Sequence, residues 1–484
     1  MAMSKTRSLR PRTGALALVT AGVLAAGLLA PAAGAPAGGA AGPRAQSSAT
    51  EGGSRAERLP SQLLQALRAA GFGGVVDFDN QQPGQPAPQV TYSPHVDVAV
   101  IEVDSHGRAI AAANVQQSRD FPNGRIVRLG SDLRALGTDF RSWDLARWDD
   151  LTPKEFATTP YPAGSALVPG ARGVPFMSPY PASTFKLLVA VQVLRLVDAR
   201  RLTLAQRTVN QAPGAACIEG GSLPAAGDEP TIAQALDAMI TFSDNTSTCL
   251  LLQQLHVLGQ LDPASNKLNA TFARLGMPTL QVNGTDPVTG ARWGVGSIDM
   301  TAMDTARLLL LLQGGRLSLE DQGGVGPSAL LSTKSRSLLL SLLGDQGFHE
   351  VLSTTNWCGL DYPVQGIPAR VPARWVGADG TVTVDGIPYG QDVRPCNAAA
   401  QVTFAHKTGL TENYGSDAGI VTALPGQDGR RYIVTVFSNV GYRYSDASQA
   451  GTDGFPCFTG LGICYSEKFA QLGGAIDDLM RRPA

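Results

Sequence analysis

Three short motifs carry residue types that can do nucleophilic chemistry. The first is Ser183-Thr184-Phe185-Lys186, which an apolar run follows at once, so that a helix over 183–197 is predicted. Residues i and i+3 share a helix face, so Lys186 lies one turn from Ser183. A desolvated lysine can accept the proton of a serine hydroxyl, and a helix N-terminus directs N–H groups toward a developing oxyanion. Alone, this spacing also arises by chance on a solvated helix face.

The second motif is Ser243-Asp244-Asn245, which stands between two predicted helices. One interpretation is a plain helix N-cap, which all three residue types make readily. The functional interpretation makes Ser243 a proton shuttle to the leaving nitrogen and Asn245 an amide that holds the substrate and Lys186. Taken by itself, the motif favours the cap.

The third motif spans 406–409, reads His-Lys-Thr-Gly and follows an apolar strand. In the functional interpretation Lys407 and Thr408 bind a substrate carboxylate, and Gly409 lets the ligand approach the backbone closely. The N–H of Leu410 would complete an oxyanion hole with the N–H of the nucleophile. The alternative is an edge strand that its polar residues protect from aggregation. His406 is expected to be a packed strand residue.

These motifs, in this order, are the set found in class A β-lactamases and penicillin-binding proteins, and the chain resembles that superfamily, class A most closely. The segments 231–246 and 405–409 are also similar to the family's own. The resemblance covers most of the chain from Val96 onward. It implies a serine acyl-transfer site between a helical subdomain and an α/β subdomain.

Apolar periodicity predicts strands near both ends of the chain and helices between them. The expected fold is therefore α+β, an α/β sandwich whose antiparallel sheet combines N- and C-terminal strands, flanked by helices, with an inserted all-helical subdomain. The predicted strands are 96–103, 109–114, 402–406, 418–424 and 432–439, and the predicted helices are 59–70, 183–197, 232–241, 245–255, 301–312 and 466–480. Two stretches, 115–180 and 373–401, are expected to be irregular inserts near the site.

The N-terminus has the pattern of an export signal. Basic residues precede an apolar run over 14–30 and a small-residue stretch over 31–35, which predicts a signal peptide within 1–35. An uncleaved anchor is the alternative, but the run is short for a span of about 20 residues. An Ala/Gly/Ser-rich linker is expected over 36–58. The predicted protein is bacterial, secreted or held in the periplasm or cell envelope, with no stable membrane span after cleavage.

A single catalytic domain is predicted over 59–484. Its helical subdomain would cover 183–345, and its α/β subdomain 59–182 together with 346–484. The domain is expected to be a monomer whose partner is a small β-lactam or a D-Ala-D-Ala peptide.

Composition and cysteine spacing exclude some other classes of protein. Charged residues make up 16% of the chain and the net charge is -1, which removes the electrostatic case for a nucleic-acid partner. No H-E-x-x-H occurs and no C-x-x-C pair has matching histidines, so neither a metal nor a cofactor is expected. Six cysteines in an exported chain predict disulfides. Proximity in sequence favours Cys457–Cys464 and Cys358–Cys396, and elimination leaves Cys217–Cys249.

One departure from the family concerns hydrolysis of the acyl-enzyme. The resemblance implies a loop glutamate that activates water, yet no glutamate occurs between Asn245 and Leu319. Counting back from the helix near 301 places Asp286 at this point, either as a shorter base or as a turn former beside Pro287. Overall similarity favours an exported β-lactamase that forms an acyl-enzyme and hydrolyses it. The alternatives are a D-Ala-D-Ala carboxypeptidase with slow deacylation and a penicillin-binding sensor that does not turn over.

Overall fold

The computed structural model describes residues 53–77, 80–149, 152–153, 159–218, 221–319, 324–346, 351–353, 366–384, 387–388, 392–446 and 466–481. They belong to one compact unit that begins at Gly53. The predicted signal peptide and most of the predicted linker lie outside the described residues.

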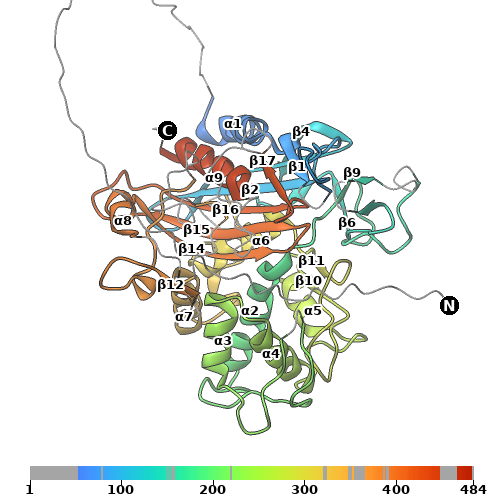
Figure 1. The fold of residues 1–484 in the computed structure, drawn as a ribbon, viewed down its shortest axis with the longest axis vertical. Helices are drawn as coiled ribbons and strands as arrows, with labels where there is room; N and C mark the ends of the chain where they lie inside the picture. The colour runs from blue at the N-terminus through green and yellow to red at the C-terminus, as the bar shows by residue number, and fades with distance from the viewer. Residues whose placement is uncertain are drawn as a thin grey trace, which may run out of the picture. The chain divides into compact units, whose positions relative to one another are not determined.

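A seven-stranded antiparallel sheet forms the centre of this unit, in the order β14-β15-β16-β2-β3-β4-β5 (Figure 1). N- and C-terminal strands meet where β16 pairs with β2, with Val434 opposite Val100. This confirms the predicted α+β fold class with a sheet built from both chain ends. The strands are β2 (Val96–Val103), β3 (Ala109–Ser118), β4 (Phe121–Leu129), β5 (Ala135–Leu136), β14 (Val402–Leu410), β15 (Gly415–Ala423) and β16 (Arg431–Ser438).

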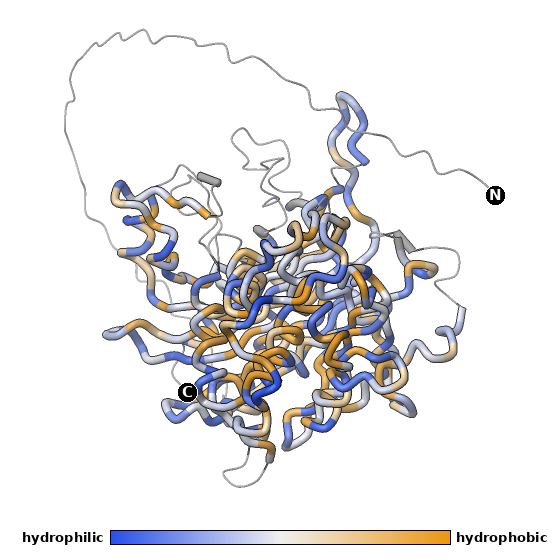
Figure 2. The backbone as a smooth tube through the Cα atoms, turned by 90° about the horizontal axis from the view of Figure 1, so that it is seen from below, coloured by the Kyte–Doolittle hydropathy of each residue, from blue (hydrophilic) through white to orange (hydrophobic). Residues whose placement is uncertain are grey.

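Helices cover both faces of the sheet, because its central strands are apolar on both sides. Helices α1 (Arg55–Ala70) and α9 (Ser466–Arg481) pack against each other above one face, and α6 (Ala302–Leu312) lies against β2 and β16 on the other (Figure 1). In β2, Val98 contributes to the core beneath α1 and α9, whereas the next residue, Ala99, contributes to the opposite core. This alternation is the period of two that a strand imposes. Segments of hydrophobic residues gather in the interior (Figure 2).

The helical subdomain is built around two helices that are buried on nearly every side, α2 (Lys186–Asp198) and α4 (Asn245–Val257). Helices α3 (Ile232–Thr241) and α7 (Thr333–Gly344) pack against α2, and α5 (Lys267–Arg274) lies nearby in the chain. Thr231 starts α3 with a capping box, in which its side chain accepts the N–H of Gln234.

The first predicted insert, 115–180, was expected to be irregular, but it contains several strands. It continues β3, adds β4 and β5 to the sheet, and forms a parallel pair from β6 (Thr138–Arg141) and β9 (Val174–Met177). Pro122 and Gly124 within β4 hide this strand from a propensity pattern. Both are tolerated because β5 pairs with β4 only at Arg128 and Leu129, so the first half of β4 has a partner strand on one side alone. As predicted, the insert comes close to the site: Trp143 packs edge-to-face against Tyr414 at 5.6 Å between ring centroids.

His95 lies fully buried among the insert's aromatic rings, Trp143, Trp148 and Phe176. Burial, with a smaller effect from the positive charge of Arg119, lowers its pKa to about 3 from a usual value near 6.5. Between these two pH values the unfolded chain binds a proton that the folded chain does not, so stability falls as the pH falls.

We therefore expect wild type to lose about 1.4 kcal/mol per pH unit from this group alone as the pH drops below 6.5. His95→Phe keeps a ring in place and removes the titration. Urea unfolding between pH 7 and 4 should show a shallower loss in the variant than in wild type, and equal slopes would contradict the assignment.

The second predicted insert, 373–401, forms a small satellite structure with its own apolar core. It contains the 3-10 turn η6 (Ala373–Trp375), a hairpin of β12 (Thr383–Val384) and β13 (Ile387–Pro388), and α8 (Arg394–Ala399). Trp375, Val382 and Val393 are buried in it, and Phe242 of the helical subdomain packs against it. The insert therefore touches the residue next to Ser243.

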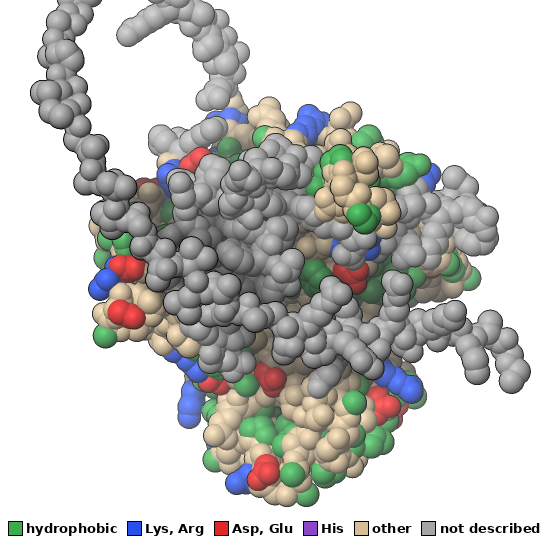
Figure 3. Space-filling view, in the orientation of Figure 1, with side chains coloured by type: hydrophobic (Ala, Val, Ile, Leu, Met, Phe, Trp, Pro, Cys, Tyr) green, Lys and Arg blue, Asp and Glu red, His purple; other side chains and the backbone are tan. Residues whose placement is uncertain are grey.

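The described surface carries acidic and basic side chains scattered singly on the face that Figure 3 shows. Among the described residues, no helix combines the length and the apolar character that a membrane crossing requires. Nor do the described residues bring together three or more His, Cys, Asp or Glu side chains that could hold a metal ion.

Candidate active site

The sequence predicts that Ser183 opens an α-helix, but in the structure this residue lies in the 3-10 turn η3 (Ala182–Phe185). Helix α2 begins three residues later, at Lys186. The residue before it, Ala182, has a φ of +45°, which L-residues rarely adopt. Such strain persists only where surrounding contacts enforce it, and it often marks functional sites. Ser183 is partly exposed, whereas its neighbours in η3 are buried.

Lys186 is fully buried at the start of α2, and its Nζ faces the second motif. The amine nitrogen lies 2.5 Å from the carbonyl oxygen of Ser243, 2.7 Å from the Oδ1 of Asn245, and 3.2 Å from the Oγ of Ser243. The predicted link between the first two motifs therefore exists in the structure. These polar contacts account for a lysine in an otherwise apolar helix.

The second motif contains a helix cap and also contacts Lys186, through different residues. Asp244 is the N-cap of α4, because its Oδ2 accepts the N–H of Ser247 at 2.5 Å. Ser243, just before the cap, has a φ of +60°. With this left-handed backbone, the Ser243 carbonyl oxygen and the Asn245 side chain both lie within hydrogen-bond distance of Lys186 Nζ. The cap thus supports the site.

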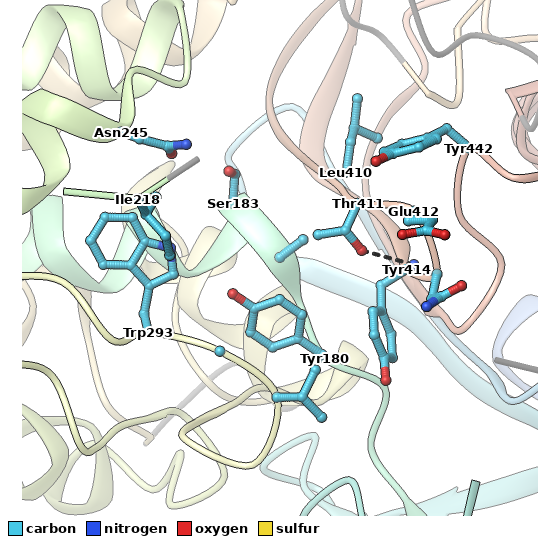
Figure 4. Close-up of a pocket in the computed structure, with 14 residues that line it drawn as sticks. Tyr180, Ser183, Ile218, Asn245, Trp293, Leu410, Thr411, Glu412, Tyr414 and Tyr442 are labelled. Carbon is cyan, nitrogen blue, oxygen red and sulfur yellow. Dashed lines mark hydrogen bonds between the residues drawn. The ribbon is translucent and has the colours of Figure 1, made fainter. Parts of the chain in front are cut away.

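Ser183 and Asn245 line one pocket of about 330 Å³, together with Ile218, Trp293, Leu410 and residues of the loop after β14 (Figure 4). In Figure 4, Trp293 and Ile218 lie on the Asn245 side of Ser183, and Leu410, Glu412 and Tyr442 lie on the other. The pocket therefore stands between the helical subdomain and the strand edge, where the resemblance implies the site.

Lys407 and Thr408 are on β14 as predicted, but both are buried and neither lines the pocket. Lys407 Nζ donates to the carbonyl of Thr408 at 2.9 Å. Burial and, secondarily, the charge of Lys186 hold the pKa of Lys407 well below its usual range, while Asp417 opposes this shift. The structure thus places the third motif's lysine near Lys186, behind the pocket wall.

Gly409 has a structural reason other than the one expected from the sequence. A Cβ at this position would lie 2.8 Å from the backbone nitrogen of Thr184, and closer still to the carbonyl oxygen of Pro181. The missing side chain therefore lets β14 approach η3. Thr184 Oγ1 and Ser416 Oγ, 2.8 Å apart, hydrogen-bond across the same contact. The next residue, Leu410, reaches the pocket with Ser183.

His406 is buried on the far side of β14 from Lys407. Its ring stacks on Phe404 at 4.0 Å between centroids, and its Nδ1 lies 2.7 Å from Asp417 Oδ1. The predicted packing of His406 in the strand agrees with this position.

Asp286 is not among the residues that line the Ser183 pocket. Its Oδ1 accepts the N–H groups of Val288 and Thr289 at 2.9 and 2.8 Å, which closes its own turn. The hydrogen bond from the Thr289 N–H makes the largest contribution to lowering the pKa of the Asp286 carboxyl, and the bond from Val288 adds to it. Partial burial of the carboxyl acts in the opposite direction. These contacts are those of a turn former, one of the two interpretations of Asp286.

The predicted disulfide Cys217–Cys249 is confirmed. It ties the segment that carries Ile218 to α4, and the Cys217 sulfur lies 3.2 Å from the carbonyl oxygen of Asn245. Cys396 is also disulfide-bonded. The predicted pairs Cys358–Cys396 and Cys457–Cys464 involve residues outside those described.

Trp293, Tyr414, Tyr442 and Glu412 were not predicted from the sequence as site residues. Trp293 packs against Phe185 at 5.5 Å and fills the wall beside Asn245. Glu412 and Tyr414 follow the third motif by only a few residues, and that proximity was the signal available. No sequence signal pointed to Trp293, since its position in the pocket depends on how a loop folds.

Comparison with known proteins agrees with this geometry. Residues 178–364 match the model of the β-lactamase enzyme family, which confirms the predicted resemblance. This segment includes Ser183, Lys186, Ser243 and Asn245, whereas the third motif lies beyond it. None of the curated proteins compared matches the chain.

Among solved structures, PBP-A is 16% identical to this chain, with 87% of this chain and 97% of that one covered, at a TM-score of 0.41. A β-lactamase from Sphaerobacter thermophilus is 17% identical, with 88% and 99% covered and a TM-score of 0.41. One from Xanthomonas campestris is 16% identical, with 86% and 98% covered, again at 0.41. At these scores the fold assignment rests on the sheet and helices described above.

Proposed function

We propose that this chain, whose residues 178–364 match the β-lactamase enzyme family, is an active-site serine hydrolase that β-lactams acylate at Ser183 and that hydrolyses the resulting ester. The observation that carries the proposal is the buried Lys186, which contacts Ser243 and Asn245. It stands three residues after Ser183, a partly exposed serine that lines a pocket.

Proton transfer explains why this arrangement suits acyl transfer. A neutral lysine has two N–H groups, and the Ser243 carbonyl and the Asn245 amide oxygen accept both. The nitrogen lone pair is then left to take the proton of Ser183 as its Oγ attacks the lactam carbonyl. Ser243 Oγ, 3.2 Å from the amine, passes that proton to the lactam nitrogen as the C–N bond breaks. Water then cleaves the ester and restores the serine.

Backbone N–H groups of Ser183 and Leu410 are our candidates for the oxyanion hole. Both residues line the same pocket. Lys407, close to Lys186, would act on a substrate carboxylate through its charge when protonated, and Thr408 and Gly409 would hold the strand in place.

A chromogenic cephalosporin tests the proposal directly. Purified protein should give an acyl adduct by intact mass spectrometry, and peptide mapping should place it on Ser183. Sustained colour development would support β-lactam hydrolysis. If no adduct and no hydrolysis appear with several β-lactams, the proposal is wrong.

A specific observation favours a second candidate, a D-Ala-D-Ala carboxypeptidase or penicillin-binding sensor with slow deacylation. Asp286 closes its own turn, and Glu412 is the one carboxylate among the described residues that line the pocket. A single stoichiometric burst with a stable adduct would support this candidate. Release of D-alanine from a D-Ala-D-Ala peptide would then separate the peptidase from the sensor.

We also propose export, on the basic and apolar pattern of residues 5–35. The Cys217–Cys249 disulfide supports an oxidising compartment. N-terminal sequencing of protein recovered from the medium or the cell envelope should find a start downstream of the apolar run.

A further inference from the structure

The second insert braces the turn that carries Ser243. Arg374, in η6 of this insert, forms a two-point ion pair with Asp237 of α3, with both N–O distances at 2.9 Å. The same Asp237 accepts a hydrogen bond from Thr241 Oγ1 at 3.1 Å. Arg374 therefore reaches, through one carboxylate, the last turn of the helix that leads into Ser243.

Aromatic contacts add a second connection to the same place. Phe242, the residue before Ser243, packs edge-to-face on Trp375 at 5.0 Å. The Arg374 guanidinium lies over both rings, at 5.3 Å from the Phe242 centroid and 4.6 Å from the Trp375 centroid. A planar guanidinium can pair with a carboxylate and stack on aromatic faces at the same time, which a lysine cannot do.

The end of α7 completes this support. Gln346 Nε2 donates to the carbonyl of Thr241 at 3.1 Å, and Trp375 Nε1 donates to the carbonyl of Asp345 at 3.1 Å. The insert and α7 thus hold residues 241 and 242 from two sides.

Such support matters because Ser243 has a strained backbone. Its φ of +60° persists only if the surroundings enforce it. In that conformation its carbonyl oxygen and the Asn245 side chain bind the Lys186 ammonium. A displacement of about 1 Å in a catalytic group can cost about a hundredfold in rate.

We propose that Arg374, with Trp375, is a positioning residue that holds the Ser243 turn against Lys186, and that the second insert serves this purpose. The inference rests on the proposed acylation of Ser183. Arg374 touches neither Lys186 nor the pocket lining, so its effect passes through Asp237 and Phe242.

The test compares Arg374→Met and Arg374→Lys with a matched control, Arg394→Met. Arg394 lies in the same insert and pairs with Asp392 at 2.7 Å, but its side chain is 61% exposed and it contacts no part of the Ser243 turn. For each variant, acylation by a chromogenic cephalosporin is measured over substrate concentration and pH, along with the melting temperature.

We expect Arg374→Met to lower the maximal acylation rate constant about 10- to 100-fold, with little change in the half-saturating concentration. Arg374→Lys should recover part of the rate, and Arg394→Met should match wild type.

A purely structural role would lower the melting temperature without lowering the maximal acylation rate constant of the folded protein, and that result would overturn the proposal. So would a wild-type acylation rate in Arg374→Met. If that variant fails to fold, Asp237→Asn gives the same test, since it keeps the shape and removes the nearer charge partner of Arg374, while Asp345 remains at 3.8 Å. Absence of any adduct in wild type would instead refute the proposed function, which keeps the two failures distinct.

Discussion

Replacing Lys186 by methionine is expected to slow acylation of Ser183 by about a thousandfold. The side chain is fully buried, and its amine contacts the Ser243 carbonyl and the Asn245 amide. Methionine nearly preserves the buried volume and removes the amine that contacts both groups. General acid–base catalysis contributes about 10²- to 10⁴-fold, so the middle of that range is the expected loss.

Stopped-flow mixing with the chromogenic cephalosporin measures this rate, and intact mass spectrometry follows the adduct. Ser183→Ala sets the background, since it should give no adduct. Lys334→Ala, on an exposed position of α7, removes a lysine elsewhere and should match wild type. Acylation of Lys186→Met at the wild-type rate would show that another group accepts the proton.

Most of the candidate site could be predicted from the sequence because its chemistry is local. Ser183 and Lys186 are three positions apart in the sequence. Asp244 and Asn245 stand at the start of a helix that the capping residue types predict. The strands at both chain ends have clear apolar patterns, so five of the seven strands of the sheet were predicted, whereas β4 and β5 were not. The order of three motifs joined these local signals into one site.

The remaining features depend on contacts between distant segments, which no local pattern encodes. Trp143 meets Tyr414, and Arg374 meets Asp237, 137 residues away in sequence. The role of Asp286 was undecided for the same reason. Counting along a chain cannot say whether a carboxylate faces the pocket or, as here, accepts the N–H groups of its own turn.

Lys407 illustrates how a correct motif can still leave the position of a side chain open. The sequence places it on a strand beside the site, and the structure agrees. The pleat and the close approach of η3 then bury it behind the pocket wall, where burial and Lys186 lower its pKa. The motif therefore predicts the strand and the residue, but not that the side chain is buried.

Gly409→Ala is expected to damage the site almost as strongly as the loss of the lysine, although glycine has no chemistry of its own. Its added Cβ would lie 2.8 Å from the backbone nitrogen of Thr184 and nearer still to the Pro181 carbonyl. Both atoms belong to the backbone that leads into and through η3, so no flexible side chain can move aside. Strand β14 and the Ser183 turn must separate.

We expect this separation to lower acylation about a hundredfold, because a shift of about 1 Å has that effect on a reacting group. Overpacking should also cost about 1–3 kcal/mol of unfolding free energy. Gly344→Ala is the matched control: it adds the same methyl group at the end of α7, where no atom lies within 4 Å. Acylation kinetics and urea unfolding of both variants provide the measurement.

The ratio of the two losses identifies what Gly409 does. If the close contact positions Ser183, acylation falls far more than the loss of folded protein explains, and the adduct still forms slowly on Ser183. If Gly409 served the ligand, as the sequence suggested, stability would match wild type and only the half-saturating concentration would rise. Wild-type values for both quantities would mean that η3 does not depend on this contact, and the strain at Ala182 would need another source.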